Sequence, residues 1–270
     1  MWRWFKWVLI TVSGLVLLLV VVTAVGNYGH IKDTDYNNPP VFVTADFIDL
    51  SRIDTISKFR SGVGHDYSGN GETCRSMRHY FGNSSKVTNV SDPSEKLKIM
   101  SQKPDPATGI EIYAPADGWL LNISGENTPV GKQIEFAPDN GQGYHIRLDH
   151  VYPDKGIHMF MRVKAGQRIG LINDGQAVDM SVFYIYRGQF RLVSYFQVMT
   201  AQVFAKYQAR GIKNRSDLII PKEVVDANPW RCENQKSTPS FAENYSDTPE
   251  GEAFNNVHLS GWVKQIDYKK

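Results

Sequence analysis

The part of the chain richest in chemically active side chains is residues 59–80. His65 lies beside Asp66 there, and imidazole and carboxylate groups are both zinc ligands. Neighbouring residues of a regular strand point to opposite faces, but Gly62 and Gly64 permit a turn in which both side chains reach one ion. The same segment then supplies Glu72, Cys74, Arg75 and His79. A metal site is one interpretation, and a loop capped by Asp66 with His65 packed or exposed is the other.

A second set of histidines is His145, His150 and His158. His145 and His150 are an odd number of residues apart, so on an unbroken strand they face opposite sides of the sheet. At most one of them then joins a given site unless the strand breaks between them. Tyr152-Pro153 places His150 near a strand end. A surface position stays the alternative for each of the three.

Several classes of function are excluded by motif and charge. The sequence has no phosphate-binding loop, no G-x-S-x-G nucleophile turn and no H-E-x-x-H zinc helix. The formal net charge is +2, and Arg3 and Lys6 are the only charged residues before Lys32. The rest of the chain therefore has equal numbers of basic and acidic residues. This balance argues against nucleic acid as a partner.

Short apolar runs separated by turn residues indicate a mainly β domain at residues 51–193. Several such runs at close spacing are typical of an antiparallel barrel or sandwich. The predicted strands are 110–114, 119–123, 133–136, 145–148, 158–163, 168–172, 180–186 and 190–193.

One helix is predicted after these strands, within a closing segment at residues 194–232. Ser194 and Gln197 fit a capping box, and Phe196, Met199, Val203 and Tyr207 follow at helical spacing. Gly211 is placed to end the helix. Residues 233–270 are rich in polar residues and are predicted to be a loose tail.

The N-terminal segment predicts the compartment. Val8–Val25 is an apolar run near the lower length limit for a bilayer span, after a cytoplasmic stub at residues 1–7 that mixes tryptophans with Arg3 and Lys6. This pattern predicts a single-pass signal anchor with the body outside the cytoplasm, joined by a linker at residues 26–50. A cleaved signal peptide, cut after Val22-Thr23-Ala24, is the alternative and gives a secreted protein.

Either compartment is oxidising for the body, where Cys74 and Cys232 are the two cysteines. They are a candidate disulfide, and two buried thiols are the alternative.

Five segments together resemble the lysostaphin-type zinc metallopeptidase domain, over about residues 58–190. They are Gly64–Ser68, Ile112–Trp119, Asp149–Val151, Val163–Gly170 and Asp179–Val182. The resemblance implies a duplicated-hybrid-motif fold of small antiparallel sheets, here behind one transmembrane helix. Enzymes of that family cut peptidoglycan cross-bridges, so it also implies a zinc cofactor and a cell-envelope peptide or glycan as partner.

The family's functional positions carry over unevenly. Asp66 matches a ligand Asp and His150 a catalytic His, but Gly62 stands where the first ligand His is expected. Asp179 and Ser181 stand where the family has a His-x-His pair. A hydrolase therefore needs a rewired metal set, predicted as His65, Asp66 and His79. His150 and Glu72 are then the predicted catalytic residues, and the predicted substrate-binding residues are Tyr67, Arg75 and Asp179.

Three functions follow from this sequence. One is a zinc-dependent peptide hydrolase with an altered ligand set, in which metal-bound water attacks a peptide carbonyl. Another is a non-catalytic envelope module that uses the same fold to bind peptide, glycan or a partner. A lesser alternative is a barrel-sandwich hybrid domain, as in lipoyl carriers and adaptor proteins, which Ala114–Gly118 and Val163–Gly170 also resemble.

Overall fold

A computed structural model of the chain describes residues 2–32, 38–69, 71–82, 98, 102–125, 130–186, 189–230, 232 and 256–259. It divides into two compact units, residues 1–39 and residues 40–270. The boundary falls between Pro39 and Pro40, where two prolines in succession disfavour both helix and strand. Among the residues whose side chains the structure describes, every buried hydrophobic one belongs to the second unit, which is called the body.

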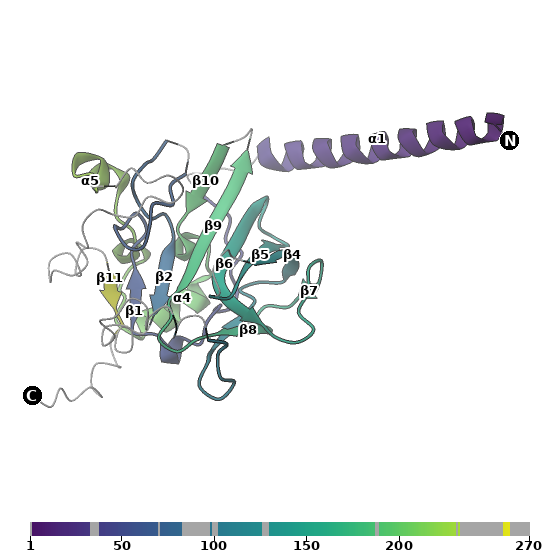
Figure 1. The fold of residues 1–270 in the computed structure, drawn as a ribbon. Helices are drawn as coiled ribbons and strands as arrows, with labels where there is room; N and C mark the ends of the chain where they lie inside the picture. Colours follow the sequence, from purple (N-terminus) through teal and green to yellow (C-terminus); the bar gives the residue numbers. More distant parts are fainter. Residues whose placement is uncertain are drawn as a thin grey trace, which may run out of the picture. The chain divides into compact units, whose positions relative to one another are not determined.

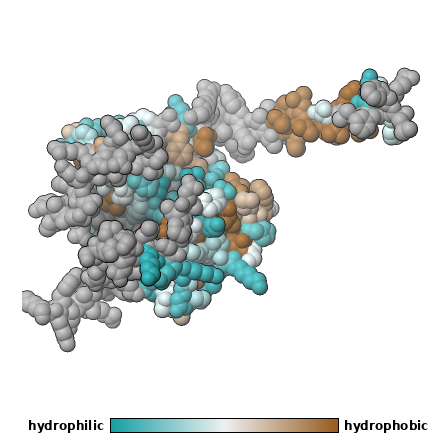
Figure 2. Space-filling model, viewed as in Figure 1, coloured by the Kyte–Doolittle hydropathy of each residue, from teal (hydrophilic) through white to brown (hydrophobic). Residues whose placement is uncertain are grey.

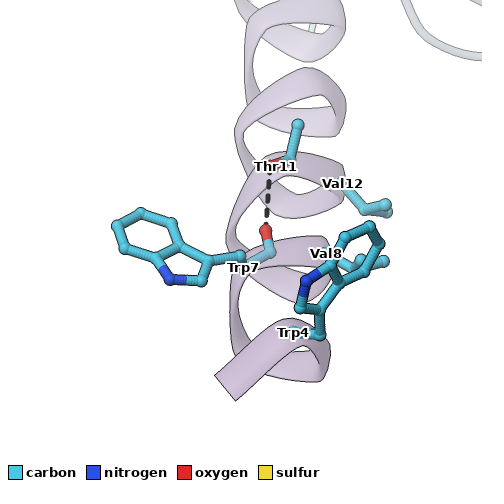
Figure 3. A pocket seen from close by; sticks show the side chains of 5 residues that line it. All are labelled: Trp4, Trp7, Val8, Thr11 and Val12. Carbon is cyan, nitrogen blue, oxygen red and sulfur yellow. Dashed lines mark hydrogen bonds between the residues drawn. The ribbon is translucent and has the colours of Figure 1, made fainter. Parts of the chain in front are cut away.

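The first unit is the helix α1, Trp2–Lys32. Its apolar side chains are exposed at consecutive positions, from Leu15 to Val21, so they point to every side of the helix. Figure 2 shows this stretch as a brown column, and Figure 3 shows Trp4 and Trp7 lining a shallow hollow near the first turns. The Thr11 hydroxyl donates a hydrogen bond to the Trp7 carbonyl at 2.8 Å. Among the described residues, no helix was found with the length and apolarity needed to cross a bilayer.

An antiparallel sheet forms the body, in the strand order β11-β1-β2-β9-β6-β5-β4-β7, with β10 paired to β9 (Figure 1). A further pair, β3 with β8, joins the end of β6 through Tyr152 and Pro153. The strand bounds are β1 Thr55–Ser57, β2 His79–Gly82, β3 Ile110–Tyr113, β4 Gly118–Gly125, β5 Lys132–Pro138, β6 Tyr144–Pro153, β7 Arg162–Val163, β8 Arg168–Ile172, β9 Val178–Tyr186, β10 Gln189–Val193 and β11 Asn256–His258.

The predicted strands appear in an antiparallel fold, to which the structure adds β1, β2 and β11, and one predicted strand is much shorter than expected. The strand predicted for residues 158–163 is only β7, Arg162–Val163, because the residues before it form turns. His158 lies in that turn region, where its Nδ1 lies 2.9 Å from the carbonyl oxygen of Met159. It therefore takes no part in the site on the sheet.

The helix predicted from Ser194 is divided in two. Ser194 and Gln197 do form the capping box, but it opens the short 3-10 helix η2, Tyr195–Gln197. The helix α4, Ala201–Gln208, begins after Thr200, whose hydroxyl caps the backbone of Val203. The division arises because the backbone between η2 and α4 forms hydrogen bonds with another segment. The amides of residues 42 and 43 donate to the Val198 carbonyl at 2.8 and 2.9 Å. The remaining helical segments are η1 Leu50–Arg52, η3 Arg215–Leu218 and α5 Lys222–Ala227.

An aromatic cluster forms the core between the sheet and α4. Phe47 packs edge-on against Phe81 and Tyr195, with ring centroids 4.7 and 5.4 Å apart, and Phe196 packs against Tyr207 at 5.1 Å. Phe42, Val43 and Phe47 are buried, so the linker predicted for residues 26–50 ends before Phe42.

The C-terminal tail returns to the sheet for one short stretch. Strand β11 pairs with β1, and Leu259 after it is fully buried with its amide bonded to the Asp54 carbonyl at 2.8 Å. Residues 256–259 are therefore not loose, because they complete the edge of the sheet. The rest of the predicted tail, residues 233–255 and 260–270, lies outside the described residues.

Candidate functional site

Polar side chains gather on one face of the sheet, across β5, β6 and β9. Along β6 the residues alternate, with Ile146 and Leu148 buried in the core and His145 and Arg147 half-exposed on the opposite face. Asp179 and Ser181 lie on the same face of β9, because Ser181 is the partner of Arg147 in the β6–β9 register. This polar face is the candidate site.

A β-bulge in β6 brings His150 onto the polar face as well. The β5–β6 register shifts between Lys132 and Ile134, and His150 has a left-handed φ of 72°. Its Nε2 therefore lies 3.7 Å from an oxygen of Asp179. Gly131 faces the bulge, and a Cβ there would lie 2.6 Å from the His150 backbone, so only glycine permits this approach. The bulge interrupts the regular strand between His145 and His150, which is the exception that the sequence left open, so both lie on the polar face.

The centre of the polar face is occupied by the guanidinium of Arg78. Its Nη1 donates to Asp179 at 2.6 Å and to Asp149 at 3.1 Å, and all three side chains are buried. The ring of Tyr67 covers the guanidinium at 3.6 Å from its centroid. A third bond fixes Asp149, whose other oxygen accepts from the Gln133 amide at 2.8 Å. Arg78 thus holds two carboxylates together with one cation.

Burial and charge determine protonation at this centre. Burial raises the pKa of Asp179 to about 6, against the opposing effect of Arg78 and then of His150. Burial also lowers the pKa of His65, and the nearby charge of Arg78 lowers it further. His65 is therefore neutral at pH 7 and stands near the group formed by Arg78, Asp149 and His150.

A row of half-exposed groups continues from this centre along β5 and β6. Glu135 accepts a hydrogen bond from His145 at 2.8 Å, and this bond lowers the pKa of Glu135. Arg147 lies 3.7 Å from the other oxygen of Glu135 and donates to the Tyr67 hydroxyl at 3.0 Å. These four residues are called the polar row below. The row offers hydrogen-bond donors and acceptors at intervals along an extended strand.

The loop that carries His65 and Asp66 is stabilised from within, and its described residues, 60–69 and 71–76, are named the site loop. The Asp66 carboxylate accepts from the backbone amides of Cys74 and Arg75, at 3.1 Å each, and from the Ser68 hydroxyl. Asp66 therefore caps the loop, which is the alternative that the sequence left open. Predicted as catalytic, Glu72 instead forms ion pairs with Arg60 at 2.6 Å and with Arg75 at 3.0 Å.

His79, predicted as a metal ligand, is a core residue. It is 1% exposed, and burial lowers its pKa to about 4. Its Nδ1 lies 2.8 Å from the Ser57 carbonyl and its Nε2 lies 2.8 Å from the Ser194 hydroxyl. Both ring nitrogens are therefore engaged, Nδ1 as donor and Nε2 as acceptor. The histidine stabilises the contact between β1, β2 and η2, and it does not join His65 and Asp66.

The donor set does not fit a catalytic zinc ion. In the described part of the chain, no group of three or more His, Cys, Asp or Glu side chains is arranged to hold a metal. Gly62 and Ser181 lack the imidazoles that the resemblance requires, and the Arg78 cation neutralises Asp149 and Asp179. The predicted set of His65, Asp66 and His79 is therefore not brought together.

The segment after α5 covers the site loop from outside. Cys74 and Cys232 form a disulfide with their Cα atoms 5.7 Å apart. The Trp230 indole donates to the Arg60 carbonyl at 3.1 Å and packs over Gly62, where a Cβ would meet the indole ring at 3.1 Å. A histidine at position 62 would therefore have to displace Trp230. The predicted substrate contact Arg75 also belongs to this closure, because it pairs with Asp226 at 2.8 Å.

Sequence reasoning singled out His145 and Tyr67 but missed Arg78, Asp149 and the other two members of the polar row, Glu135 and Arg147. The signal for the row was present, because His145, Arg147 and Asp149 alternate with apolar residues as a half-buried strand requires. No local sequence pattern indicated the role of Arg78, because its partners Asp149 and Asp179 lie 71 and 101 residues further along the chain.

Comparison with known proteins finds likeness in structure only. No family model of sequences matches this chain, and no curated protein matches it. Among solved structures, the catalytic domain of lysostaphin from Staphylococcus simulans is 16% identical and covers 58% of this chain and 95% of its own, with a TM-score of 0.32. A zinc containing peptidase from Vibrio cholerae is 14% identical and covers 57% of this chain and 39% of its own, with a TM-score of 0.33.

A third match is Csd3 from Helicobacter pylori, 14% identical, which covers 82% of this chain and 46% of its own at a TM-score of 0.34. The chain spans 44%, 46% and 56% of the first three structures it matches, about half their length. Lysostaphin-type peptidase domains are thus among the structures that resemble this mainly antiparallel β body. All of these TM-scores are below 0.5, so the functional proposal is built on this chain's own residues.

Proposed function

We propose that the chain is an envelope protein anchored in the membrane through residues 8–25, whose extracytoplasmic body binds envelope peptide or glycan without hydrolysing it. The observation that carries this proposal is the Arg78 guanidinium bound between Asp149 and Asp179. In a hydrolase of the resembling family a zinc ion activates water at this type of site. A guanidinium neutralises the carboxylates but has no open position for water, so the body keeps its polar face without the metal chemistry of that family.

The polar row supports a binding role. Glu135, His145, Arg147 and Tyr67 are half-exposed and already bonded to one another, so their positions are fixed before a ligand arrives. Preorganised groups of this kind lower the entropic cost of binding. An extended peptide or glycan carries amide and hydroxyl groups at regular intervals, which match donors and acceptors spaced along a strand.

The anchor and the compartment are supported by the sequence. Val8–Val25 is apolar apart from Thr11, Ser13, Thr23 and a glycine, and Arg3 and Lys6 precede it as expected for the cytoplasmic end of a single-pass anchor. The disulfide between Cys74 and Cys232 suits an oxidising space outside the cytoplasm. Signal cleavage stays the alternative, and it would leave the same body in the same space.

The direct test is co-sedimentation of the full chain, in mild detergent, with insoluble peptidoglycan. We expect binding without release of soluble fragments. The double variant His145→Ala, Arg147→Ala should bind about tenfold more weakly, a loss of about 1.4 kcal/mol. Lys206→Ala is the matched control, because this exposed residue of α4 pairs with Asp46 away from the polar face. Fragment release that a chelator blocks would overturn the proposal, as would equal binding by both variants.

A further inference from the structure

The exposed apolar side chains of the body gather at one end of the sheet. Outside α1, six large apolar side chains in the described residues are exposed: Val41, Trp119, Met159, Phe160, Ile185 and Val224. Phe160 is 70% exposed, Ile185 57% and Trp119 43%. Val224 belongs to α5, and the other five side chains form what is called the entry-end patch.

Strand register places this patch at one end of the sheet. Gly118 pairs with Pro138 on one side and Val163 on the other, and Tyr144 pairs with Tyr184. The starts of β4 and β6 and the ends of β5 and β9 therefore lie together. Trp119 is the second residue of β4, and Ile185 follows Tyr184 in β9.

The loop before β7 adds Phe160 to the same end. The Phe160 amide donates to the Leu120 carbonyl at 2.7 Å, and the Leu120 amide donates to the Met161 carbonyl at 2.9 Å. Phe160 itself has a left-handed φ of 61°, which is unfavourable for a bulky residue. A strained backbone that presents an exposed aromatic ring is typical of a functional surface.

The chain also enters the body at this end. Phe42 lies beside Tyr144, with ring centroids 6.2 Å apart, and Val41 precedes it exposed. Residues 26–39 separate the predicted membrane segment from the body, and even fully extended they reach at most about 50 Å. A short tether keeps a body of this size at a millimolar effective concentration near the bilayer.

We infer that the entry-end patch docks on the lipid surface of the membrane that anchors the chain, an inference that rests on the proposed anchor. Tryptophan and phenylalanine side chains partition into the interface between lipid headgroups and acyl chains. Two cations beside the patch are already paired, Arg162 with Asp139 and Lys164 with Asp117. The contact is therefore apolar and does not need anionic lipid. Docking by this end directs the His150 end of the polar face away from the bilayer, because Tyr144 and His150 lie toward opposite ends of β6.

The test places an environment-sensitive NBD dye on the full chain in phosphatidylcholine vesicles. The dye is attached to a single added cysteine at Phe160→Cys or Ile185→Cys, with Val224→Cys as the matched exposed control. We expect a blue shift, and loss of emission with quencher-labelled lipid, at positions 160 and 185 but not at 224. Addition of phosphatidylglycerol should leave these signals unchanged.

An alkaline wash of the same vesicles separates the two proposals. A chain that resists the wash while position 160 stays in water overturns the docking and leaves the anchor intact. A chain that is washed off although lipid quenched position 160 overturns the anchor and supports the docking. A blue shift at 160 that lipid quenchers do not affect would show a second copy of the chain on the patch and would overturn the inference.

Discussion

Removal of the Arg78 charge by Arg78→Met should strongly destabilise the body. Asp149 and Asp179 share this cation, and they are only 5% and 3% exposed. The variant keeps an unbranched apolar stem and removes the guanidinium, so the main loss is the charge and its hydrogen bonds. Loss of one partner of a buried ion pair costs about 3–5 kcal/mol, because the remaining charges stay buried without compensation.

The distances give a similar magnitude. At an effective dielectric constant of about 20, contacts of 2.6 and 3.1 Å correspond to gross attractions of about 6 and 5 kcal/mol. Desolvation of the ions removes several kcal/mol each, so a net loss of a few kcal/mol remains. Both carboxylates contact the same Nη1 atom, so without it two like charges lie within about 6 Å of each other.

The pH dependence distinguishes this mechanism from a packing defect. The pKa of Asp179 is already raised to about 6, and loss of Arg78 raises it further because the nearest opposing charge is gone. A carboxyl group whose folded-state pKa exceeds its unfolded value near 4 contributes stability at low pH that is lost as pH rises through the folded pKa. The destabilisation of Arg78→Met should therefore be larger at about pH 8 than at about pH 5.

Urea unfolding of the wild type and the variant at both pH values measures these differences. Arg162→Met is the matched control, because Arg162 forms an exposed pair with Asp139 and should lose no more than about 1 kcal/mol. A loss below about 1 kcal/mol for Arg78→Met, or a loss that is the same at both pH values, would refute the account of the site.

Three further predictions concern the elements around the site. The wild type should lose about 3 kcal/mol of unfolding free energy as pH falls from about 6.5 to about 4, because burial lowers the pKa of His79 from its usual 6.5 to about 4, and His79→Gln should remove this loss. Urea unfolding from about pH 7 to pH 4 measures the difference, and parallel pH dependences of wild type and variant would contradict it. Cys74→Ala with Cys232→Ala should lower the free energy of unfolding by up to about 5 kcal/mol, since the bridge spans 158 residues, and an unchanged urea midpoint would count against this. Gly131→Ala should lower the melting temperature clearly more than Gly71→Ala, because both glycines have left-handed φ but only a Cβ at position 131 would lie within 3 Å of the backbone. Equal melting temperatures of the two variants would contradict the close approach at Gly131.

Local patterns made most of the fold predictable. Alternation and turn residues identified the strands that became β3 to β6 and β8 to β10, and Gly211 does adopt a left-handed φ of 100° after α4. The helix start failed because Ser194 and Thr200 both have capping chemistry, and only tertiary contacts from Val43 divide the two turns. Capping rules predict where a helix can begin, but they do not predict which other segment forms hydrogen bonds with the backbone there.

The site was less predictable than the fold. The resemblance directed attention to Asp66, His150 and Asp179, but Asp66 caps the site loop, and spacing alone gave no information on the bulge that turns His150 toward Asp179. His79 had the residue type of a ligand, and its burial among aromatic rings, invisible in the sequence, makes it a core residue. The pairing of strands far apart in the chain decides which polar residues come into contact, and this pairing is hard to predict from a single sequence.

Metal content is the measurement that tests the central claim most directly. The full chain, purified and then dialysed against zinc and against buffer alone, would be analysed by elemental mass spectrometry beside His65→Ala. The account predicts well under one zinc per chain in both proteins, because Arg78 already neutralises Asp149 and Asp179. About one zinc per wild-type chain, lost in His65→Ala, would contradict it and would restore the hydrolase interpretation.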